Sequence, residues 1–371
     1  MRRARWIIQP NPESSRPVIY HCISRVVNRD FVFGTLEKEQ LRKFMRMYEV
    51  FSGNRVLAYC FMSNHIHLLL EVIPAAPEGL TDAELLRRLR AIHSEAWVAD
   101  VAAELAEARE AVAAGRSDES QVEAIHARFT YRMHDLSQFM KSFMQRYTQW
   151  HNGQHQRKGR LWEDRFKSVI VESGIAARTM AAYIDLNPVR AGMVTDPAEY
   201  RWSSYGEAVG GGNKGNGKKA REGLVRACMV GSTKSEIRNS KGEEDDYSAD
   251  RWKETSRIYR RAMGLALGRK SGKAEVDKEK IKPGLNTEEA LAAKDNGTVL
   301  PDMGMAAMLR HRVRYFTDGA VIGSREFVNA AFAGARGRFG PKRKDGARAL
   351  RGGASAARGV LWSVRDLRLE V

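Results

Sequence analysis

Cysteine, long apolar runs and acidic charge are all scarce in this sequence of 371 residues. Its three cysteines, Cys22, Cys60 and Cys228, lie far apart and are odd in number, which supports neither a disulfide framework nor a cysteine-rich zinc site. No apolar run approaches the roughly 20 residues that a membrane span needs, and residues 1–5 lead into no hydrophobic signal core. We therefore expect buried, reduced thiols in a cytoplasmic protein that has no membrane partner.

Basic residues outnumber acidic ones, with 62 Lys and Arg against 45 Asp and Glu. The resulting net charge of +17 and the pI near 9.9 favour a polyanionic partner, and nucleic acid is the first candidate. The alternative is a basic surface that only keeps the protein soluble, because net charge bears on association and not on fold. The length allows one large or two modest domains with real cores.

The first part of the chain has the pattern of a β-α-β-β unit. Residues 17–27 are rich in β-branched and aromatic side chains and predict a strand that ends in a turn. Apolar residues at helical spacing predict a helix over 36–51. Residues 55–62 and 66–73 predict two short strands joined by a tight turn.

More helix and a fourth strand complete the predicted core. Sequence rich in Ala, Glu and Arg predicts helix over about 81–115, a second helix follows over about 120–151, and residues 167–172 predict a strand. The order β-α-β-β-α-β, with extra helix before the last strand, is that of a ferredoxin-like fold, in which helices back an antiparallel sheet. We therefore predict an α+β protein whose compact region spans residues 1–208, with a helical insertion at about 76–132.

The composition changes after this region. Residues 209–250 are rich in Gly, Lys, Asn and Glu and can bury little apolar surface, which predicts a flexible linker. Residues 251–371 predict a mostly helical extension, in which 303–316 and 324–333 form a helix-turn-helix pair. Such a pair could bind DNA or could be purely structural. The basic tail at 336–344 is expected to be mobile and could touch phosphate backbones without selecting a sequence.

Two histidines stand at the head of the third predicted strand. Side chains alternate along a strand, so His65 and His67 point to the same side and Ile66 points to the other. Such a pair can hold a metal ion between two imidazoles. The alternative is a polar patch on a solvated face.

The predicted helix before the fourth strand carries a tyrosine and a histidine four residues apart. Tyr147 and His151 share a helix face at this spacing. If the helix packs across the sheet beside His65 and His67, this face supplies a nucleophile and a third metal ligand together. Without that packing, Tyr147 is a tyrosine of the hydrophobic core.

A basic segment with two aromatic residues follows this helix. Its cationic side chains suit phosphate contacts, and Trp162 could stack on an unpaired base. Phe166 could equally lie in the core, and the alternative for the whole segment is a solvated charged loop. The candidate DNA-binding residues are Arg157, Lys158, Arg160, Trp162, Arg165 and Lys167.

Five motifs occur in order along the chain: His65-Ile66-His67, Tyr147, and the segments 159–168, 183–192 and 202–205. Together they resemble the single-tyrosine HUH transposases, and most closely the REP-associated tyrosine transposases of the insertion-sequence-200-like branch. The resemblance covers about residues 15–208. It implies a ferredoxin-like catalytic core that cuts and rejoins single-stranded DNA, often at a folded hairpin. It also implies a divalent metal, Mg²⁺ or Mn²⁺, and no nucleotide cofactor.

Carried over to this sequence, the resemblance makes His65 and His67 metal ligands and Tyr147 the nucleophile. The family takes its third ligand from the tyrosine helix about one turn further on, where His151 is the preferred candidate and Asn152 the alternative. Imidazoles favour softer metals than Mg²⁺, so Mn²⁺ suits an all-histidine set better. Relatives include dimers that share active sites and monomers that do not, so a homodimer is one arrangement that the resemblance allows.

Two other hypotheses stand beside a DNA-cleaving transposase. A decayed or domesticated transposase would bind hairpin DNA or RNA without cutting it. Another type of His-x-His enzyme would need Asp or His at position 69, and Leu69 disfavours both. The insertion at about 76–132 and the extension beyond residue 208 depart from the family, and they leave strand preference, partner choice and regulation open.

Overall fold

The computed structural model describes residues 6–8, 16–212, 215–229, 248–264, 309, 316–317, 319–349 and 361–364. Within these ranges, no helix is long and apolar enough to cross a membrane. Cys22, Cys60 and Cys228 are all buried and none forms a disulfide, as the sequence predicts.

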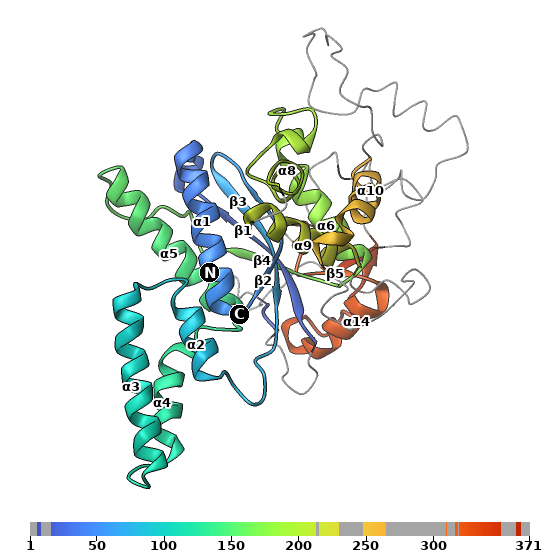
Figure 1. The fold of residues 1–371 in the computed structure, drawn as a ribbon. Helices are drawn as coiled ribbons and strands as arrows, with labels where there is room; N and C mark the ends of the chain where they lie inside the picture. Colours follow the sequence, from blue (N-terminus) through green and yellow to red (C-terminus); the bar gives the residue numbers. More distant parts are fainter. Residues whose placement is uncertain are drawn as a thin grey trace, which may run out of the picture.

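The described strands form one mixed sheet in the order β2-β3-β1-β4-β5-β7-β6 (Figure 1). Neighbouring strands are antiparallel except β4 and β5, which are parallel. The strands are β1 (Val18–Arg25), β2 (Arg55–Phe61), β3 (His65–Val72), β4 (Lys167–Val171), β5 (Val321–Gly323), β6 (Arg348–Ala349) and β7 (Trp362–Val364). A sheet combined with many helices confirms the predicted α+β class.

Helices cover both faces of this sheet (Figure 1). We call the face under α1 (Thr35–Ser52) and α5 (Leu136–Gln154) the α5 face, and the face under α6 (Ile175–Asp185) and α9 (Gly215–Met229) the α6 face. The other helices are α2 (Asp82–Leu89), α3 (Glu95–Ala113), α4 (Glu119–Thr130), α7 (Asn187–Arg190), α8 (Ser204–Gly210), α10 (Trp252–Ala262) and α14 (Arg325–Gly334). Short 3-10 turns lie at Val27–Arg29, Pro197–Glu199, Ala249–Arg251 and Arg336–Arg338.

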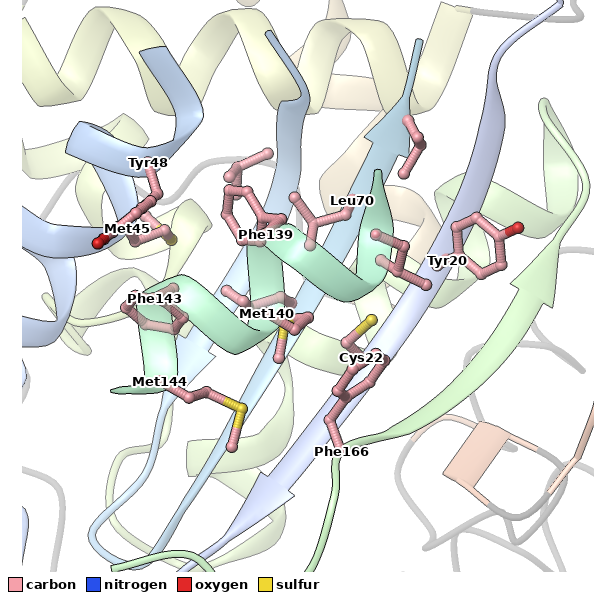
Figure 2. Packing of buried hydrophobic residues seen from close by; sticks show 14 of the residues in the cluster. Tyr20, Cys22, Met45, Tyr48, Leu70, Phe139, Met140, Phe143, Met144 and Phe166 are labelled. Atoms are coloured by element: carbon pink, nitrogen blue, oxygen red, sulfur yellow. The ribbon is translucent and has the colours of Figure 1, made fainter. Parts of the chain in front are cut away.

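The core of the α5 face is built by alternate residues of the strands. Figure 2 shows α5 crossing the sheet with its apolar side chains on those of β1 and β3. The set includes Tyr20, Cys22, Ile66, Leu68, Leu70, Phe139, Met140, Phe143 and Met144, all buried. Because side chains alternate along a strand, the residues between them, His21 on β1 and His67 on β3, point to the α6 face.

The insertion consists of several shorter helices where the sequence predicts one long helix and the start of another. α2, α3 and α4 precede α5, and α3 and α4 extend away from the sheet as a pair (Figure 1). The breaks coincide with side chains that cap helix starts: Ser94 accepts from the backbone N–H of Trp97, and Asp135 accepts from that of Gln138 at 2.7 Å.

Part of the segment expected to be a linker is a packed helix. Residues 215–229 form α9, and Leu224 and Ala220 lie in the core of the α6 face with β2. Gly223 permits the close approach, because a Cβ there would lie 2.5 Å from the Val56 carbonyl oxygen. Apolar residues at helical spacing outweigh the glycine-rich composition here. Two further parts of the predicted linker, 213–214 and 230–247, lie outside the described residues.

The C-terminal extension adds strands to the sheet. β5 pairs with β4, and α14 follows where the sequence predicts the second helix of the pair. Most of the first predicted helix, 303–316, lies outside the described residues, and α14 directly follows a sheet strand. The segment expected to be a mobile basic tail is anchored by Phe339, which is 7 % exposed and whose ring centre lies 4.7 Å from that of Phe332 on α14.

Candidate functional site

His65 and His67 lie on the same side of β3, as strand alternation predicts. Their ring centres are 5.1 Å apart and their planes are nearly perpendicular, at 79°. A tight turn starts the strand, since the Met62 backbone N–H donates to the His65 carbonyl at 2.9 Å. His65 is half-buried, whereas His67 is only 3 % exposed.

A third histidine, His21 on β1, joins them on the α6 face. Its Nε2 lies 2.9 Å from Nδ1 of His67, and the two ring planes are inclined by only 15° with centres 5.1 Å apart. His67 pairs across the ladder with Ile23, so His21 is its diagonal neighbour. Alternation in the predicted strand places His21 on one face with Ile19 and Ile23. The strand register that brings it to His67 cannot be obtained from the sequence alone.

Tyr183 from α6 faces this histidine pair. Its ring centre lies 6.4 Å from that of His67 and 6.3 Å from that of His21, in both cases nearly edge to face. Tyr183 is 2 % exposed. It begins a motif on which the transposase resemblance rests, but no role was predicted for it from the sequence.

The Arg190 side chain can contact Tyr183 because α6 ends between the two residues. α6 ends at Asp185, and Pro188 near the start of α7 prevents one continuous helix. The Arg190 guanidinium then lies 4.0 Å from the centre of the Tyr183 ring, and its Nη2 donates to the Tyr183 carbonyl at 2.6 Å. Asn187, four residues after Tyr183, donates through Nδ2 to the Ile184 carbonyl at 3.0 Å.

Burial sets the charge of these side chains. It lowers the pKa of His21 to about 4 and holds the pKa of His67 well below its usual range, where His65, His21 and Arg190 lower it further. Burial also lowers the pKa of Arg190, to about 10, which leaves the guanidinium charged at neutral pH. The face therefore combines neutral imidazoles, the form that binds metals, with one cation beside a tyrosine.

Residues of the C-terminal extension cover this group. The Phe316 ring packs on Tyr183 with centres 4.8 Å apart, and the Phe316 carbonyl lies 2.7 Å from Nδ1 of His21. The Leu309 carbonyl accepts from Nη1 of Arg190 at 2.9 Å. His21, His67 and Tyr183 are therefore buried beneath residues from far along the sequence, whereas His65 stays half-buried.

Tyr147 lies on the α5 face, on the other side of the sheet from His67. It is completely buried, its hydroxyl donates to the Glu37 carbonyl at 3.3 Å, and its ring packs against Phe33 and Trp162. Burial raises the pKa of the Tyr147 hydroxyl, and the Glu37 carboxylate raises it further. The structure thus does not bring Tyr147 together with His65 and His67.

His151 and Asn152 lie near Tyr147 and away from the histidine pair. The His151 ring centre is 4.4 Å from that of His155, and the Asn152 amide donates to the Gly159 carbonyl at 3.0 Å. Among the described residues, no group of three or more His, Cys, Asp or Glu side chains is arranged to hold a metal. A third ligand from α5 is therefore not part of the arrangement on the α6 face.

The basic segment after α5 is largely exposed, but its tryptophan is not. Lys158, Arg160, Arg165 and Lys167 are exposed, and Arg157 is half-buried. Trp162 is 9 % exposed, and its Nε1 donates to the Thr148 hydroxyl at 3.0 Å. The Trp162 ring packs in the hydrophobic core, so the prediction that it stacks on an unpaired base is not supported.

An exposed ring lies in the neighbouring loop. Phe31, which is not among the DNA-binding residues predicted from the sequence, is 82 % exposed. Hydrogen bonds tie its loop to the start of β3 and to the basic segment: Asn64 Nδ2 donates to the Arg29 carbonyl, and the Val27 N–H donates to the Leu161 carbonyl, both at 2.9 Å. These bonds place Phe31 beside the basic segment and the start of β3. We call the surface formed by Phe31 and the exposed cations of the basic segment the rim.

A comparison with protein families agrees with the sequence resemblance. Residues 14–79 match the family model described as "Transposase IS200 like". This segment contains β1, α1, β2 and β3 with His21, His65 and His67, and over it the resemblance to this class of transposases is confirmed.

One solved structure was also matched, that of a REP-associated tyrosine transposase bound to a REP hairpin. It is 14 % identical, covers 58 % of this chain and 89 % of its own, and has a TM-score of 0.34. The comparison with curated proteins found no match.

Proposed function

We propose that this protein is a transposase that cuts and rejoins single-stranded DNA through a covalent phosphotyrosine link, with Tyr183 as the nucleophile. The observation that carries the proposal is the position of Tyr183, whose ring lies 6.4 Å from that of His67 on the α6 face. Tyr147, which the motif pattern favours, lies on the opposite face. The proposal therefore moves the nucleophile to the tyrosine that begins the 183–192 motif.

We take the core to be the ferredoxin-like core of the HUH transposases. The order β2-β3-β1-β4 supports this assignment, because β3 lies between two strands that are consecutive in sequence and all neighbours are antiparallel. The crossovers also agree, since α1 connects β1 with β2, and the segment that ends with α5 connects β3 with β4.

We propose that His65 and His67 hold a divalent metal ion, Mg²⁺ or Mn²⁺. The two rings point to one side of β3, and burial keeps His67 in the neutral form that can bind a metal. Asn187 could add an amide oxygen, because its Nδ2 is already bonded to the Ile184 carbonyl. Two imidazoles and an amide leave positions for water and phosphate oxygens, and they suit Mn²⁺ better than Mg²⁺. Once bound, the ion would withdraw charge from the scissile phosphate.

Arg190 is proposed to assist the tyrosine. A phenol has a reference pKa near 10, so attack at neutral pH needs help with deprotonation. The guanidinium, 4.0 Å from the ring centre of Tyr183, favours the phenolate electrostatically. The Tyr183 oxygen bonds to phosphorus, and the bond from phosphorus to the leaving DNA oxygen breaks. The new link retains a phosphodiester's energy, so rejoining requires no ATP.

The proposed partner is single-stranded DNA that carries a hairpin. The exposed cations Lys158, Arg160 and Arg165 can contact phosphates, and the exposed ring of Phe31 can stack on an unpaired base. The cytoplasmic location and the homodimer remain predictions.

A second candidate is a hairpin-binding protein that no longer cuts. The observation in its favour is the cover over Tyr183, because the Phe316 ring lies on this side chain, which is 2 % exposed. A transposase must open this cover to admit DNA, whereas a binding protein can leave it closed and use the rim.

The test is incubation of the full chain with labelled single-stranded oligonucleotides from the DNA that flanks its gene, with Mn²⁺ or with EDTA, followed by a denaturing gel. A metal-dependent band that retains the label at the mass of protein plus DNA is expected. Tight hairpin binding without such a band would replace the transposase by the binding protein.

A further inference from the structure

We propose that His21 is a positioning residue that holds His67 in the tautomer with a proton on Nδ1, so that Nε2 presents its lone pair to a divalent cation. The inference rests on the proposed role of His67 as a metal ligand. It adds a residue of β1 and a carbonyl of the C-terminal extension to that site.

The hydrogen-bond chain determines where each proton lies. The Phe316 carbonyl can only accept, so Nδ1 of His21, 2.7 Å away, must donate. A neutral imidazole with a proton on Nδ1 has a bare Nε2, which must accept. The atom 2.9 Å from this Nε2 is Nδ1 of His67, which therefore carries the proton of that ring. The remaining nitrogen of His67, Nε2, is left with its lone pair.

The surroundings of His21 keep its imidazole neutral. His21 is 0 % exposed, and the Arg190 guanidinium lies against Tyr183, which contacts His21 on the same face. A second buried cation next to Arg190 would lose hydration and be repelled. The angle of only 15° between the two ring planes agrees with a hydrogen bond that lies in the plane of both rings and fixes the orientation of His67.

This arrangement corresponds to the outer support that metal-binding histidines commonly have, in which the second ring nitrogen donates to a fixed acceptor. The acceptor is usually a carboxylate or a backbone carbonyl. Here it is another histidine, which is itself anchored to a carbonyl 295 residues further along the chain. The C-terminal extension is therefore connected to the metal site through two hydrogen bonds.

Two substitutions at one position separate hydrogen bonding from packing. His21→Gln retains an amide that can donate to the Phe316 carbonyl and accept from His67, whereas His21→Leu fills similar space with no polar atom. His126→Gln is the matched control, because His126 lies in the insertion and contacts Asp82. Circular dichroism and thermal unfolding verify that each variant is folded.

The first readout is the ¹⁵N chemical shift pattern of the imidazoles in the metal-free full chain. Wild type and His21→Gln are expected to show His67 with a proton on Nδ1 and a bare Nε2, and His21→Leu is expected to lose that preference. A proton on Nε2 of His67 in the wild type overturns the inference without any variant, even if His21→Leu does not fold.

The second readout is Mn²⁺ affinity by calorimetry. Loss of outer support typically costs about 10- to 100-fold in metal affinity, so His21→Leu should bind that much more weakly, with His21→Gln within a few-fold of wild type. Unchanged affinity in His21→Leu, or no Mn²⁺ binding by the wild type, overturns the inference. Neither readout uses DNA, so absence of a covalent adduct alone counts only against the proposed function.

Discussion

The two faces of the sheet each place a tyrosine beside histidines, but the surroundings of the two tyrosines differ. Tyr147 on the α5 face donates to a backbone carbonyl, and the nearby Glu37 carboxylate disfavours its phenolate. Tyr183 on the α6 face lies beside the Arg190 cation and the paired rings of His21 and His67. The same residue types thus serve packing on one face, and on the other form a group suited to chemistry.

The sharpest contrast between the faces is expected from Tyr183→Phe and Tyr147→Phe. Each removes one hydroxyl from a buried ring, so the two are matched in size. Covalent adduct should fall more than about 10³-fold in Tyr183→Phe, because loss of a nucleophile leaves only residual catalysis, and it should remain in Tyr147→Phe. Quantified denaturing gels give both values. The opposite pattern would restore Tyr147 as the nucleophile.

On the α5 face, stability should depend on the buried residues far more than on the exposed ones. Phe143 is a fully buried residue of α5 (Figure 2), so Phe143→Ala should lower the free energy of unfolding by about 3–5 kcal/mol. Leu36→Ala, at a position on α1 that is 54 % exposed, should change it by less than about 0.5 kcal/mol. Urea denaturation measures both. Equal effects would contradict the assignment of this face as core.

Metal affinity should distinguish the histidines of the two faces. His67→Ala removes a proposed ligand and should weaken Mn²⁺ binding by at least about 100-fold, more than loss of its support would. His151→Ala, on the α5 face, should leave the affinity unchanged. Calorimetry on the two folded variants measures both affinities. A loss of Mn²⁺ affinity confined to His151→Ala would show that His151 on α5 is a metal ligand and that His67 is not.

The smallest effect is expected for a substitution in the rim, measured as affinity for single-stranded DNA. Phe31→Ala should weaken binding of single-stranded DNA by about 10-fold, because stacking of a base on an aromatic ring is worth roughly 1–3 kcal/mol. Tyr131→Ala, which removes a ring 63 % exposed in the insertion, should change nothing. Fluorescence anisotropy with a labelled oligonucleotide compares them. Equal losses would mean that neither ring reads a base.

Strand alternation was sufficient to predict that His65 and His67 share a side, and apolar spacing located β1, α1, β2, β3 and β4 to within a few residues. Neither pattern shows which face of the sheet α5 covers. Tyr147 and Tyr183 both stand on helices with an apolar side, so only the packing separates them. The contact between His21 and Phe316 joins residues 295 positions apart and follows from no local pattern.

The central claim is that Tyr183 forms the link to DNA, and peptide mapping of the adduct tests it directly. Trypsin should release Tyr183 in the peptide 179–190 and Tyr147 in the peptide 147–157, since Arg residues flank both. After nuclease treatment of the wild-type adduct, mass spectrometry should find the nucleotide on peptide 179–190. A nucleotide on peptide 147–157 would contradict the account and place the chemistry on the α5 face.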